Sequence, residues 1–298
     1  MPDRQRAQII DPLAAIGGGE IGPYPFDLYQ RRCLAQGDSW FSVGALPPTK
    51  TTRIVAELKF LQSALIVNCA YPGAVLHKMT ETTTAPYFRR FLAGKLAMKW
   101  DAILLSGGGN DLIAATGAPP ASPPALRLLR TAAERGAGPL AAKDYISEPG
   151  WTTFADHLGI VFNQLIDLRD SGVNRPTPLV WHNYARVMPR PAPAGLGFGP
   201  WLLPALDSYA VPPADRLAVA DELLSRLGAL IGSLVAARHA ADADCRLFVA
   251  DSMNAGVTLA DAESTDVSGD WVNEIHLTRS GYQKCAEAWQ QVLDPLLA

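Results

Sequence analysis

Polar side chains that could do chemistry follow each of five short apolar runs in this 298-residue chain. The first run ends in "GDSW", in which Ser39 offers a hydroxyl, and the third ends in "GGGND", in which Asn110 offers an amide. The fourth run ends at His182. The carboxyl ends of parallel strands meet at one edge of a sheet, which is where ligands bind in such folds. We therefore expect these groups to share one site.

One further histidine, His276, lies in the segment "DWVNEIHLTRSGYQKCAEAW", just before a helical pattern. A serine hydroxyl is a weak nucleophile until a neighbouring base takes its proton, and histidine is the usual base. If His276 enters the same edge of the sheet as Ser39, it could take the proton of Ser39 and pass it to a leaving alcohol. The two residues are the candidate nucleophile and base.

The elements that must position these groups are five runs of continuous hydrophobicity, which is typical of strands buried on both faces. Helical patterns separate and follow them, and strand–helix alternation favours a parallel sheet covered by helices. We predict an α/β fold, a three-layer α/β/α sandwich with a mostly parallel five-stranded sheet. The predicted strands are Arg32–Gln36, Ala64–Cys69, Trp100–Ser106, Thr177–His182 and Arg246–Ala250.

The chain reads as an N-terminal arm over 1–30 and a single domain over 31–298, with two insertions rich in proline and glycine at about 112–150 and 189–212. Loops this long inside a compact domain are usually functional lids or mobile segments. The second insertion carries apolar side chains, Phe198 and Trp201 among them, so we expect it to border the pocket. For the first, a lid and a surface insertion without a role are both open.

Composition excludes several classes of protein. With 26 Lys+Arg against 29 Asp+Glu, the net charge is −3, which gives little support to nucleic-acid binding. The cysteines have no C-x-x-C spacing, so a disulfide framework or zinc site is not expected, nor is any other metal or cofactor. No apolar stretch suits a signal peptide or a membrane span, which predicts a cytoplasmic protein if the N-terminus is native. The expected partner is a small-molecule ester, and the oligomeric state is left open.

Taken together, four blocks resemble the SGNH (GDSL) hydrolase superfamily, which contains esterases, lipases and acetylesterases with a flavodoxin-like fold. Gly37-Asp38-Ser39-Trp40 looks like the GDSL block, and Gly73 matches the second-block glycine. Gly108-Gly109-Asn110-Asp111 matches the GxND block and His276 the final-block histidine. The blocks fall in the family's order and span 37–276.

The resemblance implies cleavage of carboxylic esters through an acyl-Ser39 intermediate. It assigns the oxyanion hole to the backbone N–H groups of Ser39 and Gly73 and to the side-chain amide of Asn110. These types suit the task, since glycine lets the backbone approach closely and an amide donates without changing charge. We expect Asp38 and Asp111 to fix turns rather than to touch substrate.

One position departs from the family pattern. An aspartate usually stands three residues before the histidine, and this chain has Asn273 there, with Leu277 where a proline commonly follows. An amide can orient an imidazole ring but cannot neutralise an imidazolium. Either Asn273 orients His276 while a carboxylate supplies charge, or Ser39 and His276 act as a dyad. The candidate carboxylates are Asp251, Asp270 and Glu274.

A set of mostly aromatic residues near the predicted site could bind substrate: Trp40, Tyr71, His182, Tyr184, Phe198 and Trp201. They favour small lipophilic or short-acyl esters. The same rings could stack on a sugar, which leaves carbohydrate O-acetylesterase activity as an alternative.

Other functions find less support in the sequence. No serine satisfies the G-x-S-x-G elbow of α/β-hydrolases, which excludes that fold. "GGGEIG" (17–22) matches G-x-G-x-x-G, but prolines follow where a phosphate-binding helix should begin, so it reads as a flexible arm. The missing aspartate keeps open a third alternative, a catalytically silent binding protein of the same fold.

Overall fold

The computed structural model describes residues 4–17, 24–42, 52–81, 83, 85–195 and 197–298, and the "GGGEIG" segment lies largely outside them. Its centre is a sheet of six strands in the order β2-β5-β3-β6-β7-β8, and every neighbouring pair is parallel. The strands are β2 (Gln8–Ile10), β3 (Arg31–Gly37), β5 (Ala64–Asn68), β6 (Ala102–Ser106), β7 (Leu179–His182) and β8 (Leu247–Ala250). The predicted α/β fold is confirmed, and the five predicted strands are all present with ends within two residues of those expected.

The sixth strand, β2, comes from the segment expected to be an arm. It pairs with β5 from Gln8 to Ile10 at the edge of the sheet. A second, two-stranded sheet joins β1 (Gln5–Arg6) to β4 (Lys59–Phe60). Both N-terminal strands are only two or three residues long, and Ile10 is the one buried residue in them, so they carry too short an apolar pattern to be recognised from sequence.

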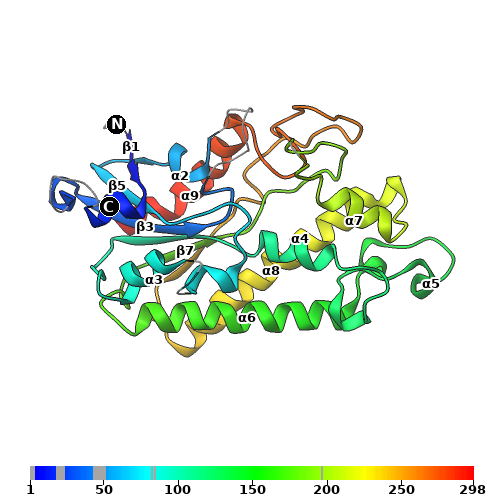
Figure 1. Cartoon of the computed structure of the whole chain (residues 1–298), viewed down its shortest axis with the longest axis horizontal. Coiled ribbons are helices and arrows are strands. Elements are labelled where there is room, and N and C mark those ends of the chain that lie inside the picture. The colour runs from blue at the N-terminus through cyan, green and yellow to red at the C-terminus, as the bar shows by residue number, and fades with distance from the viewer. Residues whose placement is uncertain (1–3, 18–23, 43–51, 82, 84, 196) are drawn as a thin grey trace.

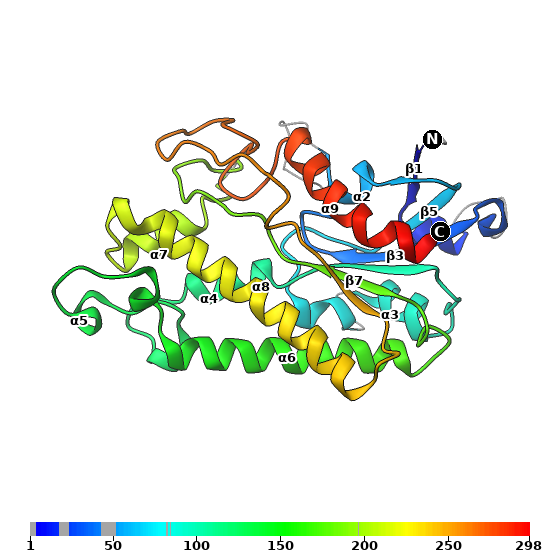
Figure 2. The same ribbon diagram turned by 180° about the vertical axis from the view of Figure 1, so that it is seen from behind.

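Helices cover both faces of the sheet, as Figure 1 shows. Helices α2 and α9 lie on one face, and α3 and α6 lie on the other (Figures 1 and 2). Helix α8 packs against β8, β7 and α6. The helices are α1 (Pro12–Ile16), α2 (Ile54–Glu57), α3 (Pro86–Ala93), α4 (Gly109–Thr116), α5 (Ala132–Arg135), α6 (Glu148–Asp170), α7 (Leu202–Ser208), α8 (Arg216–Ala241) and α9 (Arg279–Leu297), with short 3-10 turns η1 (Phe26–Leu28), η2 (Leu76–Thr80), η3 (Pro124–Leu126), η4 (Ala142–Tyr145) and η5 (Pro213–Asp215).

The core sits on both faces of the central strands. All five residues of β6 and all four of β7 are buried, which explains their unbroken hydrophobicity. Helix α6 contributes Phe162, whose ring stacks on Trp181 of β7 at 4.6 Å between centroids. Among the helices of the described ranges, none is both long and apolar enough to cross a membrane. The cytoplasmic location stays a prediction.

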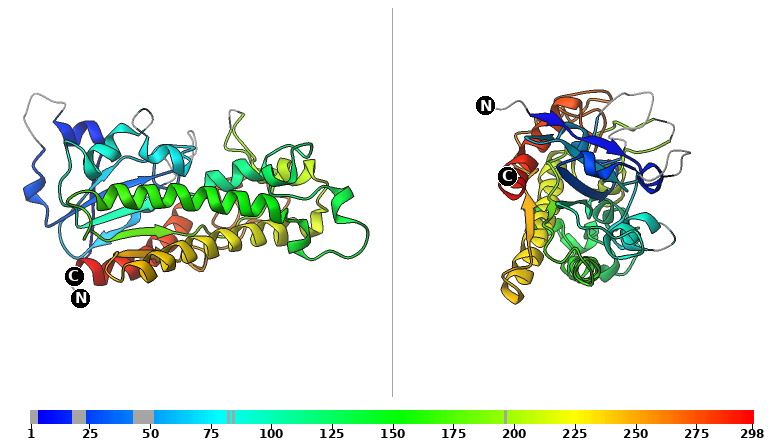
Figure 3. Two further views of the ribbon diagram at one scale, coloured as in Figure 1. Left: turned by 90° about the horizontal axis from the view of Figure 1, so that it is seen from below. Right: turned by 90° about the vertical axis from the view of Figure 1, so that its left-hand side faces the viewer.

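Two helices are much longer than the strands they cover. Helix α6 has 23 residues and α8 has 26, lengths of roughly 35 and 39 Å at 1.5 Å per residue. Their far ends carry α5 and α7, at the end of the molecule away from both termini (Figures 1 and 3). The two segments expected as insertions therefore contain short helices, and they extend the molecule beyond the carboxyl ends of the strands.

Candidate active site

Ser39 lies in a tight turn directly after β3, and its two preceding residues explain the turn. Gly37 packs so closely against β6 that an added Cβ would come within 2.7 Å of the Cβ of Ser106. The Asp38 carboxylate accepts a hydrogen bond from the Trp40 N–H at 2.9 Å, and the Asp38 carbonyl accepts one from the Phe41 N–H at 3.2 Å. Asp38 therefore fixes the turn, as an Asx residue commonly does.

The turn brings Ser39 to the histidine expected from the sequence. The Oγ of Ser39 lies 2.9 Å from Nε2 of His276, although 237 positions separate them in the chain. On the other side of the ring, Nδ1 lies 3.1 Å from Oδ1 of Asn273. The three side chains form a continuous chain of hydrogen bonds with the geometry of a nucleophile, a base and an orienting group.

The orientation of the Asn273 amide is fixed by the backbone. Its Oδ1 accepts hydrogen bonds from the N–H groups of Ile275 at 3.1 Å and His276 at 2.9 Å, so the oxygen, not the NH₂ group, faces the ring. An oxygen at Nδ1 requires that this nitrogen carry the imidazole proton. Nε2 is then left with its lone pair toward Ser39, which is the tautomer that a general base needs.

The three carboxylates considered as partners of His276 are engaged elsewhere. Glu274 accepts hydrogen bonds from the N–H groups of Leu202 at 2.8 Å and Leu203 at 2.7 Å, so it caps the start of α7. Asp270 pairs with Lys284 at 2.6 Å. Asp251 accepts hydrogen bonds from the side chains of Asn183 and Asn254. Of the alternatives left open by the sequence, the structure has the amide of Asn273 alone at the ring.

Burial also sets the charge of the ring. His276 is 4% exposed, and burial lowers the pKa of its imidazole to about 4. No carboxylate contacts it in the described part of the chain to offset that cost. At neutral pH the ring is therefore neutral and able to accept a proton.

The three predicted oxyanion donors lie together. Ser39, Gly73 and Asn110 line one cavity with His276. Within the described residues, the N–H groups of Ser39 and Gly73 make no hydrogen bond. Asn110 gives its Nδ2 to the Ala74 carbonyl at 3.0 Å, which uses one of its two N–H groups. Donors remain available for a negative charge at this place.

Two cavities meet at Ser39. The large cavity, of about 270 Å³, is lined by Ser39, Pro72, Gly73, Asn110, Phe198, Trp201, Ile275 and His276. The small cavity, of about 40 Å³, has Ser39, Asn110 and Ile275 in common with it, and its other walls are mainly apolar: Leu112, Ile113, Val187, Leu202 and Leu224, with Asp38, Trp40, Gly109 and Tyr184.

The predicted substrate residues separate into two groups. Trp40 and Tyr184 line the small cavity, and Phe198 and Trp201 line the large one. Tyr71 is not part of the lining of either cavity among the described residues.

His182 is also outside both cavities. It is 0% exposed, and its ring packs against those of Trp40 and Phe41, so it is buried in the core beside the site rather than in it. The position of His182 at the end of a strand did not show whether its side chain lines a cavity or is buried in the core.

His182 belongs to a second serine–histidine pair, which the sequence analysis did not predict. Its Nε2 lies 2.9 Å from Oγ of Ser106, and its Nδ1 lies 3.1 Å from Oγ of Ser252. Ser106 in turn donates to Asp38 at 2.9 Å, and Tyr184 donates to the other oxygen of Asp38 at 2.5 Å. We call Ser106 and His182 the sealed pair, and Ser39 and His276 the open pair.

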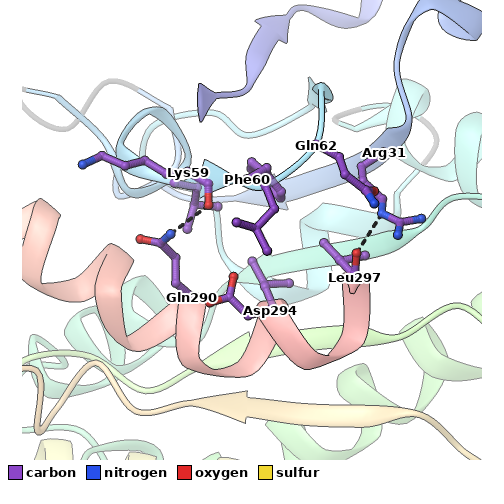
Figure 4. A pocket seen from close by; sticks show the side chains of 10 residues that line it. Arg31, Lys59, Phe60, Gln62, Gln290, Asp294 and Leu297 are labelled. Atoms are coloured by element: carbon purple, nitrogen blue, oxygen red, sulfur yellow. Dashed lines mark hydrogen bonds between the residues drawn. The ribbon is translucent and has the colours of Figure 1, made fainter. Parts of the chain in front are cut away.

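Another cavity lies at the opposite end of β3. It measures about 20 Å³ and is lined by residues of β4 and α9, among them Phe60 and Leu297 (Figure 4). Gln290 donates to the Lys59 carbonyl and Arg31 to the Leu297 carbonyl across it. Its lining includes neither serine–histidine pair.

Comparisons with known proteins give structures but no sequence relatives. No family model matches the chain, and neither does any curated protein. The chain is similar to the carbohydrate acetylesterase Est24 from Sinorhizobium meliloti at 15% identity, covering 90% of this chain and all of that one, with a TM-score of 0.47. It is also similar to an extracellular lipase from Streptomyces rimosus (13% identity, 89% and 99% covered, TM-score 0.47) and to an aryl esterase from M. smegmatis (14%, 89% and 99%, 0.47). Because the identities and TM-scores are this low, we argue function from the site residues of this chain and not from these structures.

Proposed function

We propose that this protein is a serine hydrolase of the SGNH type that cleaves carboxylic esters. The observation that carries the proposal is the 2.9 Å contact of Ser39 Oγ with His276 Nε2, in a cavity that also contains Gly73 and Asn110. Nucleophile, base and oxyanion donors then surround one small space, which is the arrangement that acyl transfer needs.

The reaction would run in two halves. His276 Nε2 accepts the Ser39 proton as Oγ attacks the ester carbonyl, and the charge on the carbonyl oxygen is met by the Ser39 and Gly73 N–H groups and the free N–H of Asn110. The imidazolium then gives its proton to the leaving alcohol, and an acyl-Ser39 ester remains. Water activated by the same imidazole attacks that ester and restores the serine.

The role we assign to Asn273 is positional. Its oxygen holds the Nδ1–H tautomer of His276, as an asparagine does in the Cys-His-Asn sites of papain-like proteases. It adds no negative charge to balance the imidazolium. We therefore expect a base that is correctly oriented but less strongly stabilised when protonated than one beside a carboxylate.

We assign the two cavities to different parts of the ester substrate. The small cavity holds about 40 Å³, room for roughly three water-sized groups, and six aliphatic side chains line it. We assign it to a short apolar acyl chain of about two to four carbons. The large cavity, at about 270 Å³, takes the alcohol.

A second candidate, carbohydrate O-acetylesterase, is favoured by the aromatic residues of the large cavity. Phe198 is 55% exposed, and Trp201, which lines the same cavity, is half-buried. Exposed aromatic faces could stack on a sugar ring that carries an acetyl group, and the small cavity suits acetyl equally well.

The first test is chemical. A fluorophosphonate probe should label the wild-type protein on Ser39, identified by peptide mass spectrometry, and should not label Ser39→Ala. A folded wild type that takes up no probe would support the silent binding protein instead. Ser106→Ala is the matched control and should be labelled as the wild type is.

The second test separates the two substrates. The substrates are p-nitrophenyl esters from acetyl to dodecanoyl, measured beside acetylated xylose and acetylated oligosaccharides. Among the p-nitrophenyl esters, kcat/KM should be highest for acyl chains of two to four carbons. Leu224→Ala enlarges the small cavity and should move the maximum to longer chains. A higher kcat/KM on the acetylated sugars would replace the first candidate by the second.

A further inference from the structure

Three metal-ligating side chains meet outside the open pair. They are His77 from η2, Asp111 from α4 and His157 from α6, and one ligand atom from each lies within 4.8 Å of the others. The two imidazole rings are 5.9 Å apart at their centroids, with 67° between their planes. The residues are far apart in sequence, so the fold alone brings them together.

The carboxylate of this cluster lacks a cationic partner. Asp111 is 8% exposed, and both of its oxygens accept from the Leu76 N–H, at 3.2 and 3.0 Å. In the described part of the chain no lysine or arginine forms an ion pair with it. A buried carboxylate is costly unless a positive charge or several hydrogen bonds compensate it.

We propose that His77, Asp111 and His157 bind a divalent transition-metal ion of the zinc type. Two imidazoles and one carboxylate form a recognised zinc donor set, with a fourth position left for water. In tetrahedral sites with bonds of about 2.0–2.1 Å, ligand atoms lie roughly 3.3 Å apart, so the set must contract slightly. His157 is exposed, and rotation of its ring can supply that movement and leave the ion open to solvent.

The position of the ion gives it a structural effect on the neighbouring site. Asp111 follows Asn110 on the first turn of α4, and His77 follows the segment that carries Gly73 and Ala74. Asn110 already binds the Ala74 carbonyl. An ion would tie these two segments to each other and to α6, and so would hold the proposed oxyanion donors at fixed separation.

Zinc binding is tested directly, without reference to esterase activity. Protein without a histidine tag is stripped with chelator, freed of it, and titrated with Zn²⁺ by isothermal calorimetry, with metal content measured after dialysis. We expect one ion per chain and a higher Tm with zinc. In His157→Ala, which removes an exposed side chain and should fold, affinity should fall by more than the ~10–100-fold that loss of an outer-shell partner costs.

The control is His239→Ala, a histidine of α8 whose Nε2 meets the Leu247 carbonyl away from the cluster. It should bind zinc as the wild type does. Asp111→Asn, which keeps the size of the side chain, should weaken binding as well. No binding by folded wild type, or equal binding by wild type and His157→Ala, would overturn the proposal. Loss of ester hydrolysis with zinc binding intact would leave it standing.

Discussion

The open pair and the sealed pair have almost the same internal geometry. In each, a serine Oγ lies 2.9 Å from a histidine Nε2, and a side-chain oxygen lies 3.1 Å from Nδ1. The pairs differ in which nitrogen of the histidine carries the proton, and so in whether the serine donates to the ring or accepts from it. Ser106 donates its proton to Asp38, so its oxygen must accept from His182 Nε2–H. In the open pair the Asn273 oxygen holds the proton on Nδ1, so Nε2 accepts from Ser39.

The surroundings of the two pairs differ as well. Ser39 and His276 line a cavity with free N–H donors, whereas Ser106 and His182 are both 0% exposed. Burial lowers the pKa of His182 to about 3, below that of His276. A short serine–histidine contact is therefore no evidence of catalysis by itself. The third group must impose the correct tautomer, and a substrate carbonyl must be able to reach the hydroxyl.

The largest effect should come from the open pair. Ser39→Ala removes the nucleophile, and His276→Ala removes the base, so each should lower kcat by about 10⁴–10⁶-fold because the members of such a unit act together. Steady-state hydrolysis of p-nitrophenyl butyrate measures the loss, and circular dichroism checks the fold. Comparable losses in Ser106→Ala would show that the pairs had been assigned the wrong way round.

Removal of an oxyanion donor should have the next largest effect. Asn110→Ala deletes the free N–H and should cost about 10²–10³ in kcat, or roughly 2.7–4 kcal/mol, because the lost interaction exists mainly in the transition state. KM should change little. A rise in KM at unchanged kcat would mean that Asn110 binds the ground state instead.

The sequence predicted the sheet well and the site in part. Unbroken apolar runs are a strong signal for buried parallel strands, and all five were located. The turn residues after them placed Ser39, Gly73 and Asn110 at one edge, where the structure has them around one cavity. Short edge strands such as β2 bury few residues, so their pattern was too weak to predict.

Side-chain direction was the part that sequence could not supply. His182 is the last residue of β7, and its ring lies against Trp40, whereas Ser39 lies in the turn after β3 and lines the cavity. The partner of His276 was equally open. Glu274, next to Asn273, fits the sequence pattern as well, but in the structure its carboxylate caps α7.

The contribution of Asn273 to catalysis is tested by removing its side chain. Asn273→Ala loses the tautomer control and should reduce kcat by about 10–10²-fold, part of the contribution of an oriented base, while His276→Ala removes activity. Equal losses would make the asparagine as essential as the base. Both variants are measured with the same p-nitrophenyl ester.

Asn273→Asp tests charge rather than orientation. In the wild type the His276 pKa is about 4, so kcat/KM should fall on the acid side only as pH approaches that value. A carboxylate at 273 favours the imidazolium and raises the His276 pKa, which should move this acid limb toward neutral pH by roughly one to three units. An unmoved limb would mean that another group controls it. The pH profile of kcat/KM with a pH-insensitive leaving group measures this.

The smallest effect on activity is expected from the sealed pair, where the change should appear in stability. Ser106→Ala should alter kcat by no more than about tenfold, but it leaves Asp38 and His182 each short of a buried partner, at a cost of about 1–3 kcal/mol in the free energy of unfolding. Burial raises the pKa of Asp38 to about 6, against hydrogen bonds that lower it, including the one from Ser106. Since the folded pKa lies above the unfolded value, Asp38 costs stability as pH rises from about 4 through 6. Loss of the Ser106 hydrogen bond should enlarge that cost, so urea unfolding should show a greater destabilisation at pH 8 than at pH 4. A deficit independent of pH would mean that Ser106 supports the fold through packing alone and does not stabilise the ionised Asp38.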